Sequence, residues 1–247
     1  LSGGEIQNMV SQAPEGMEIE TFVHGAMCIS YSGRCLLSHY LTGRNSNQGD
    51  CAQPCRWNYQ LVEATRPGEA FTLEDGEDGA FLFNSKDLCL AREIPQLMAM
   101  GVASFKIEGR MKSPYYVATV ISIYRRIIDA CWANPEFVVP DAWIRELSKV
   151  SHRNYTTAFY YGKTSGEDQN YGTSSYTRHY DFIGVVLDYD DDTGMATIEQ
   201  RNKMTVGDTV ELISPVGDAL YHSQRAEIIM DAEGNPLEST PHPKMIY

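Results

Sequence analysis

Several features that define common protein classes are missing from this chain of 247 residues. No run of 18 or more apolar residues occurs, so the sequence predicts no membrane-spanning helix. The N-terminus has neither the basic segment nor the apolar segment of a secretory signal peptide. It also lacks an initiator methionine and reads as the middle of a fold, so we expect a fragment of a longer protein. Together these absences predict a cytoplasmic location.

Catalytic motifs of two large hydrolase classes are also missing. The sequence has no H-E-x-x-H zinc motif and no G-x-S-x-G nucleophile elbow. A cysteine nucleophile would need a histidine partner, for which His24 and His39 are the nearby candidates. The formal net charge of −13 argues against a broad phosphate-binding surface, although a local basic groove is compatible with it.

Cysteine is the residue type whose distribution is most informative. The chain has 6 cysteines, and all but Cys131 lie between Cys28 and Cys89. Disulfide-rich domains are usually short and secreted, whereas this chain is long and lacks a signal peptide. Cys131 falls on the apolar face of a predicted helix and is expected in the core. The other five cysteines therefore predict a metal or iron–sulfur site rather than disulfide bonds.

The spacing of these five cysteines favours an iron–sulfur cluster over zinc. Zinc sites usually pair their ligands as C-x2–4-C, and only Cys51 and Cys55 come near that pattern. A cubane cluster takes four thiolates, which a long glycine-rich segment can supply at wide intervals. A helix is expected to begin near Cys89, where the helix dipole would favour a thiolate. The predicted ligands are Cys28, Cys35, Cys51 and Cys89, with Cys55 as the alternative fourth ligand or a neighbouring thiol.

Hydrophobic periodicity predicts alternating strands and helices in the first half of the chain. This order predicts an α/β domain with a parallel sheet over residues 1–135, interrupted by a cysteine-rich insertion at 25–79. Three strands cannot close a barrel, so the sheet is either open or continued by strands that a fragment would lack. The expected strands are 18–24, 80–84 and 103–107, and the expected helices run from Ser85 or Asp87 to Met100 and from Pro114 to Trp132.

The pattern of apolar residues changes in the second half of the chain. Residues 136–177 contain one amphipathic helix, expected from Asp141 to Val150, and then an irregular linker rich in Tyr, Gly and Ser. From residue 178 to 247, short alternating strands are separated by turns such as Val206-Gly207-Asp208. This pattern predicts a separate, small β-barrel domain.

Charged side chains follow the predicted strands of the first half. In a parallel sheet, active sites lie just beyond the carboxyl ends of the strands. Ammonium and guanidinium groups at that edge could bind the carboxylates of a substrate. The candidate catalytic residues are His24, Lys106 and Glu108, and the candidate substrate-binding residues are Lys86, Lys106, Arg110 and Lys112.

Two stretches around the first cysteines have the character of a family signature. Residues 20–28 read ETFVHGAMC, and residues 33–38 read GRCLLS. Together they resemble the signature of the collagenase-like peptidase family U-32. The resemblance covers most of the chain through further similar stretches at 44–57, 84–89 (NSKDLC), 105–116 (FKIEGRMKSPYY), 201–211 and 241–243.

The resemblance implies a fold and a set of functions. The fold is a (β/α) TIM-type barrel, of which this chain would hold the last three strands, followed by a small β-domain. The most similar subgroup is that of the prephenate-dependent tRNA uridine 5-hydroxylation proteins, and several members carry a [4Fe–4S] cluster on cysteines like these. An RNA-modifying enzyme is therefore expected, with prephenate as co-substrate and tRNA as partner. Collagenase-like proteolysis and hydroxylation of another RNA or of a quinone are the alternatives.

Overall fold

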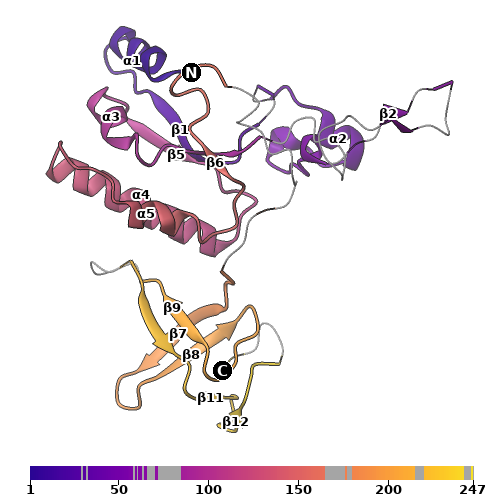
Figure 1. Ribbon diagram of the computed structural model, residues 1–247, viewed down its shortest axis with the longest axis vertical. Helices are drawn as coiled ribbons and strands as arrows, with labels where there is room; N and C mark the ends of the chain where they lie inside the picture. The colour runs from indigo at the N-terminus through magenta and orange to yellow at the C-terminus, as the bar shows by residue number, and fades with distance from the viewer. Residues whose placement is uncertain are drawn as a thin grey trace. The chain divides into compact units, whose positions relative to one another are not determined.

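The computed structural model describes residues 1–28, 30–31, 33–57, 59, 61–62, 64–65, 70–71, 85–164, 176, 180–214, 220–241 and 246. The chain divides into two compact units, Leu1–Arg178 and His179–Tyr247 (Figure 1). The strand expected at 80–84 lies outside the described residues. Among the helices of the described residues, none has the length and apolar character that a membrane span requires.

A four-stranded mixed sheet forms the centre of the first unit, in the order β5-β1-β4-β6. Strands β1 and β5 are parallel, as the sequence predicts, with Glu20 opposite Ser104 and Phe22 opposite Lys106. Strand β4 is antiparallel to β1 and parallel to β6, so the prediction of an all-parallel sheet is wrong at β4. The strands span Glu20–Gly25 (β1), Asp87–Cys89 (β4), Ser104–Ile107 (β5) and Tyr155–Thr156 (β6).

The start of the predicted helix at Ser85 or Asp87 is also wrong, because strand pairing takes up the backbone there. The Asp87 N–H donates to Asn154 O at 2.9 Å, and the Leu90 N–H donates to Val23 O at 2.8 Å. Helix α3 begins later and spans Ile94–Ala99, with a proline in its first turn. Proline is favoured there because the first helical N–H groups have no partner inside the helix. Cys89 therefore lies in a strand and not at a helix N-terminus.

Helices cover the sheet and supply most of the core. Helix α4 (Pro114–Ala133) is capped by Ser113, whose hydroxyl accepts from the Tyr116 N–H. It packs against α3 and against α5 (Asp141–Leu147), and Figure 1 shows it running alongside them. Helix α1 (Gly3–Gln12) begins with a reciprocal cap between Ser2 and Glu5. The buried residues of α4 recur at three- and four-residue spacing: Tyr116, Thr119, Val120, Ile123, Tyr124, Ile127 and Cys131.

The cysteine-rich insertion forms short elements beyond the end of β1. Helix α2 (Leu37–Thr42) contacts the 3-10 turn η2 (Pro54–Arg56), and a second 3-10 turn, η1 (Ser46–Gln48), lies between them in sequence. The two-residue strands β2 (Leu61–Val62) and β3 (Ala70–Phe71) pair with each other. The described part of the insertion is therefore built of one short helix, two 3-10 turns and one pair of two-residue strands.

The turn from β1 into this insertion depends on Gly25. Its φ is +115°, and a Cβ there would lie 2.4 Å from the carbonyl oxygen of Glu108. A side chain at this position would therefore collide with backbone, in addition to adopting an unfavourable dihedral. The absence of a side chain lets the end of β1 approach the segment that follows β5.

In the described residues of the second unit, the strands form three two-stranded antiparallel sheets. Its strands and turns agree with the alternating sequence pattern. The pairings among its described residues do not close a barrel, so the expected β-barrel stays a prediction. The pairs are β7 (Gly184–Asp190) with β8 (Met195–Gln200), β9 (Thr209–Leu212) with β10 (His222–Arg225), and β11 (Ile229–Met230) with β12 (Pro236–Leu237).

The packing of α4 predicts a difference between two isoleucines on the same helix. Ile127 is fully buried, whereas Ile121 is 51% exposed. We expect Ile127→Ala to lower the free energy of unfolding by about 2–4 kcal/mol, because it leaves a cavity in the core. Ile121→Ala should change it by no more than about 0.5 kcal/mol. Urea unfolding followed by circular dichroism measures both, and equal losses would contradict the assigned burial.

Candidate cysteine centre and a buried cation cluster

Four cysteines are distributed over the turns that follow β1. Cys28 comes three residues after the strand, Cys35 precedes α2, Cys51 lies between the two 3-10 turns, and Cys55 is within η2. The Ser30 N–H donates to Cys28 Sγ at 3.4 Å, and the Gln53 N–H donates to Cys51 Sγ at 3.3 Å. Such N–H donors favour thiolate over thiol and are typical of the surroundings of iron–sulfur clusters.

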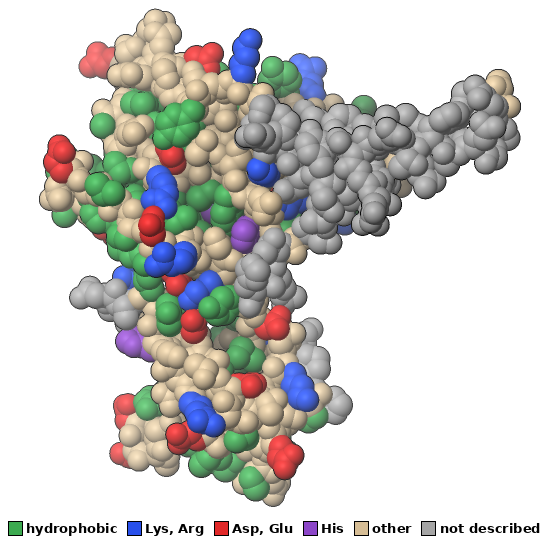
Figure 2. Space-filling view, viewed as in Figure 1, with side chains coloured by type: hydrophobic (Ala, Val, Ile, Leu, Met, Phe, Trp, Pro, Cys, Tyr) green, Lys and Arg blue, Asp and Glu red, His purple; other side chains and the backbone are tan. Residues whose placement is uncertain are grey.

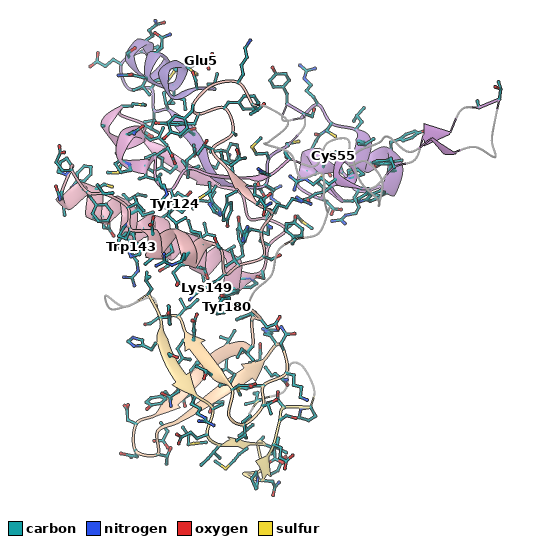
Figure 3. The ribbon with its side chains drawn as sticks, viewed as in Figure 1. Glu5, Cys55, Tyr124, Trp143, Lys149 and Tyr180 are labelled. Atoms are coloured by element: carbon teal, nitrogen blue, oxygen red, sulfur yellow. The ribbon has the colours of Figure 1, made fainter. Side chains whose placement is uncertain are left out.

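The pKa of the Cys55 thiol responds to the charges of the other three cysteines in these turns. Burial raises the pKa of the Cys55 thiol, while the neighbouring Arg56 guanidinium opposes the rise. The thiolates of Cys28, Cys51 and Cys35 raise this pKa further, because their like charge disfavours a second thiolate. The four sulfurs are therefore electrostatic neighbours, and Figure 3 shows Cys55 beside α2. A bound cation would relieve the repulsion among the thiolates.

A single metal ion and a cluster require different spacings of their sulfur ligands. Within the described ranges, no three His, Cys, Asp or Glu side chains are grouped closely enough to hold one metal ion. A tetrahedral zinc site would bring its sulfurs to roughly 3.8 Å from one another, as its Zn–S bond length requires. A cubane cluster holds its ligand sulfurs roughly 6–7 Å apart. The cysteine turns therefore offer no single-ion site among the described residues, and the cluster stays a prediction.

Cys89 has different surroundings. It lies in β4 directly opposite His24 of β1, and its sulfur is 4.0 Å from the Tyr124 hydroxyl. Burial raises the pKa of Cys89 to about 11, which is the reverse of the lowered pKa expected at a helix N-terminus. The role of Cys89 as the fourth ligand stays a prediction, and its alternative, Cys55, is the cysteine that neighbours the other three.

His24 is enclosed by aromatic rings. It is 1% exposed, and its ring contacts those of Tyr116, Tyr124 and Tyr155. Its Nδ1 lies 3.3 Å from the Tyr124 hydroxyl, which itself donates to Val23 O. Burial lowers the pKa of His24 to about 3, and the charges of His152 and Lys112 lower it further. His24 is therefore a neutral, buried imidazole rather than an exposed general base.

The predicted charged residues after β5 are only partly brought together. Lys106 is exposed and pairs with Glu20 at 3.3 Å, as a surface ion pair does. Glu108 accepts a hydrogen bond from the Arg110 N–H at 3.0 Å. The Arg110 guanidinium lies against Gly49, where a Cβ would be 1.4 Å from Nη1, so Arg110 reaches the cysteine turns. Lys86 is part-buried beside β4.

A buried charge cluster around Asp87 was missed by the sequence reasoning. Asp87 is 1% exposed, and Arg56 and Arg153 are each 4% exposed. Asp87 Oδ1 lies 3.7 Å from Arg56 Nη1 and 3.9 Å from Arg153 Nη1, and Asp87 Oδ2 accepts from the Arg153 N–H at 3.1 Å. Burial raises the pKa of Asp87, while Lys112 and Arg56 oppose that rise. Each arginine is too far for a hydrogen bond to Oδ1.

Lys112 is the one predicted substrate-binding residue that belongs to this cluster. Its ammonium donates to Ser151 O at 2.9 Å and lies 3.9 Å from the centre of the Tyr176 ring. Burial lowers the pKa of Lys112, and Asp87 opposes that change. Asp87 and Arg56 belong to stretches that carry the family resemblance, but no local pattern marks Arg153, which follows α5.

Comparison with protein families identifies the chain. The family model "Peptidase family U32" matches residues 1–170, and "Peptidase family U32 C-terminal domain" matches residues 178–247. The chain belongs to peptidase family U32. This result confirms the resemblance of the cysteine and strand-end motifs.

The relatives of this U32 chain include proteins of different names. It is 48% identical over 231 residues to tRNA hydroxylation protein P1 of Bacillus subtilis, covering 93% of this chain and 54% of that protein. It is 34% identical over 281 residues to tRNA hydroxylation protein P of Escherichia coli, covering 98% and 60%. A collagenase of Porphyromonas gingivalis is 32% identical over 206 residues, covering 82% and 55%. The chain spans about half the length of these relatives.

One solved structure is similar to part of this U32 chain. It is the C-terminal domain of a protein from Geobacillus thermoleovorans assigned to the U32 peptidases, with 43% identity and a TM-score of 0.25. The match covers 26% of this chain and 71% of that one.

The burial of His24 predicts a defined loss of stability in acid. Its pKa is about 3 in the folded protein and about 6.5 when unfolded, so the unfolded state binds more protons between these values. His24 therefore destabilises the fold progressively as the pH falls below about 6.5, by up to about 1.4 kcal/mol per pH unit. Urea unfolding between about pH 7 and pH 5 should show a steeper pH dependence for the wild type than for His24→Gln. Parallel dependences would contradict the buried, neutral imidazole.

Proposed function

We propose that this chain is part of a tRNA-hydroxylating enzyme whose cysteine turns hold a [4Fe–4S] cluster and whose co-substrate is prephenate. The observation that carries the proposal is that Cys28, Cys35 and Cys51 all lie on the turns after β1 and near enough to Cys55 to raise the pKa of its thiol. The 48% identity to tRNA hydroxylation protein P1 of Bacillus subtilis supports tRNA as the substrate. Because the chain spans about half of that relative, the activity is proposed for the whole protein.

The cysteine turns would hold the cluster through Cys28, Cys35 and Cys51, with Cys89 as the fourth ligand and Cys55 as its alternative. When bound, a cluster of this kind supplies electron transfer or a site for an anionic ligand. The chain's own residues then have two tasks. The N–H groups of Ser30 and Gln53 stabilise negative charge on sulfur, and Arg56 places a positive charge beside Cys55.

The fold supports a larger frame for this centre. The parallel pairing of β1 with β5 is that of neighbouring strands in a (β/α) barrel, which we propose for the complete first domain. The hairpins of the second unit are compatible with a small β-barrel. In such a barrel the segments after β1 and β5, with Cys28 and Arg110, share one end of the sheet.

Proteolysis is the second candidate function, favoured by the similarity to a collagenase. A cysteine peptidase needs a thiolate beside an imidazolium, so the cysteine pKa must be low and the histidine pKa high. Cys89 and His24 lie opposite each other, but their pKa values are about 11 and about 3. Both groups are therefore neutral, which opposes this mechanism. Collagen cleavage that a thiol blocker abolishes would support the peptidase instead.

The proposed function predicts that one cysteine controls both iron content and RNA modification. We expect Cys35→Ser in the full-length protein to lose the cluster, because serine is a poor ligand for iron in this setting. Cells that lack the protein and express this variant should then contain no 5-hydroxylated uridine in tRNA, as measured by nucleoside mass spectrometry. Cys131→Ala is the matched control, since Cys131 is in the core of α4 and should leave both readouts intact. Full hydroxylation with Cys35→Ser would reject the proposal.

The fourth ligand is tested by a pair of variants. If Cys89 is the ligand, Cys89→Ser should lower the iron content while Cys55→Ser retains it. The reverse result would assign the role to Cys55, the electrostatic neighbour of the other thiols. Retention of all iron in both variants would contradict a four-cysteine centre.

A further inference from the structure

The charge cluster around Asp87 contains polar groups that the described part of the chain does not satisfy. Arg56 Nη1, Arg153 Nε and Nη1, and Asp87 Oδ1 are buried and have no hydrogen-bond partner there. Buried guanidinium groups are costly without partners, so they are normally paired. Here Arg56 Nη1 and Arg153 Nη1 lie 3.7 and 3.9 Å from Asp87 Oδ1, which is too far for a hydrogen bond, and Arg153 Nε also has no hydrogen-bond partner.

The cluster also has an excess of positive charge. Arg56, Arg153 and Lys112 contribute three cations, whereas the carboxylates that act on them among the described residues are Asp87, which the two arginines share, and Glu108, which acts on Lys112. The Lys112 ammonium reaches the same group, since Asp87 is an electrostatic neighbour of Lys112. An added anion would therefore be attracted to this cluster and would supply the missing acceptors.

We propose that Arg56, Arg153 and Lys112 form a binding site for a small hydroxy-carboxylate, with Asp87 accepting a hydrogen bond from its hydroxyl group. The planar guanidinium groups suit a carboxylate because each can donate two parallel hydrogen bonds. A hydroxyl elsewhere on the same ligand would give Asp87 Oδ1 the donor it lacks. The rings of Tyr116 and Tyr176, which flank the Lys112 ammonium, offer apolar contact to the rest of the ligand.

Burial favours a small molecule over an RNA phosphate. At 4% exposure, Arg56 and Arg153 are beyond the reach of a folded RNA backbone. On the face drawn in Figure 2, Lys and Arg side chains are interspersed with Asp and Glu. A surface of mixed sign holds phosphates weakly, because that binding depends on concentrated positive charge. Shielding of this kind suits a small ligand, because binding sites for small molecules enclose most of the ligand surface.

Arg56 connects this site to the cysteine turns. It follows Cys55 directly, and its Nη2 donates to the carbonyl of Met27, which precedes Cys28. The residue that would bind the carboxylate, Arg56, is thus the direct neighbour in sequence of Cys55, a cysteine of the candidate centre. The co-substrate of the proposed function would bind at this site, and in that respect the inference rests on the proposed function. The binding site itself does not require RNA or catalysis.

Calorimetric titration of the full-length protein with malate, succinate and inorganic phosphate tests the site. Malate should bind more tightly than succinate, because only malate has the hydroxyl for Asp87. Arg153→Met should weaken malate binding by about tenfold or more, the size expected for charged hydrogen bonds. The matched control is Arg125→Met, since Arg125 is exposed and pairs with Asp129 on α4. Its affinity for malate should equal that of the wild type.

If Arg153→Met does not fold, two further variants still test the site. Arg153→Lys keeps the charge but loses the fork of donors, so it should also weaken malate binding. Asp87→Asn removes the negative charge that repels the carboxylates of succinate. This variant should bind succinate about tenfold more tightly, which is the size of one relieved repulsion in a buried site. A merely structural cluster would give neither change in affinity.

Three results would overturn the proposal. The first is that neither malate nor succinate binds. The second is that a short RNA binds at the cluster while malate does not. The third is that the Arg153 variants bind malate with the affinity of the wild type. Equal affinities for malate and succinate would contradict the role of Asp87. Malate binding by a wild-type full-length protein that does not hydroxylate tRNA would contradict the proposed function alone. Hydroxylation of tRNA by a protein that binds neither dicarboxylate would contradict this site alone.

Discussion

Asp87 is a carboxylate with almost no exposure to solvent, and three segments of the first unit are arranged around it. Its backbone is part of β4, its Oδ2 accepts from the Arg153 N–H that follows α5, and its Oδ1 faces Arg56 of the cysteine turns. A buried carboxylate is tolerated only when cations or donors surround it. The position of η2 and the path of the chain after α5 are therefore both tied to the sheet through one charge.

The same constraint brings the cysteine turns to the edge of the sheet. Arg56 holds the carbonyl of Met27 while it faces Asp87, so the segment with Cys28 and the one with Cys55 are fixed together. Arg110, which follows β5, occupies the space beside Gly49 in the same insertion. Gly25 permits this approach because a side chain there would collide with the Glu108 carbonyl. The described part of this glycine-rich segment is thus anchored by two arginines, of which Arg56 is buried, and its cysteines form no disulfide bonds.

Part of this arrangement could be predicted from sequence because local patterns determine it. The apolar period of α4 and the proline that opens it predicted that helix and the burial of Cys131. The parallel pair β1 and β5 followed from strand–helix alternation. Strand β4 was taken for a helix, because its pairing with β1 and β6 is a tertiary interaction that periodicity does not reveal. Arg153 was missed for the same reason.

The charged residues show this limit of pattern reading most clearly. Lys106 follows a strand as an active-site cation would, yet it pairs with Glu20 at the surface. Lys112, from the same motif, is partly buried, and its ammonium donates to the carbonyl of Ser151 near Arg153. His24, expected at an open site, is covered by tyrosines from α4 and β6, as the contact of Tyr124 with the sheet shows (Figure 3).

The central claim is that the cysteines after β1 bind one iron–sulfur cluster. Iron and acid-labile sulfide, measured in full-length protein purified without oxygen, test it most directly. We expect about four iron and about four sulfide per chain, with the charge-transfer absorption of a cubane cluster. Zinc in place of iron, or a folded protein that binds neither iron nor sulfide after anaerobic reconstitution, would contradict the claim.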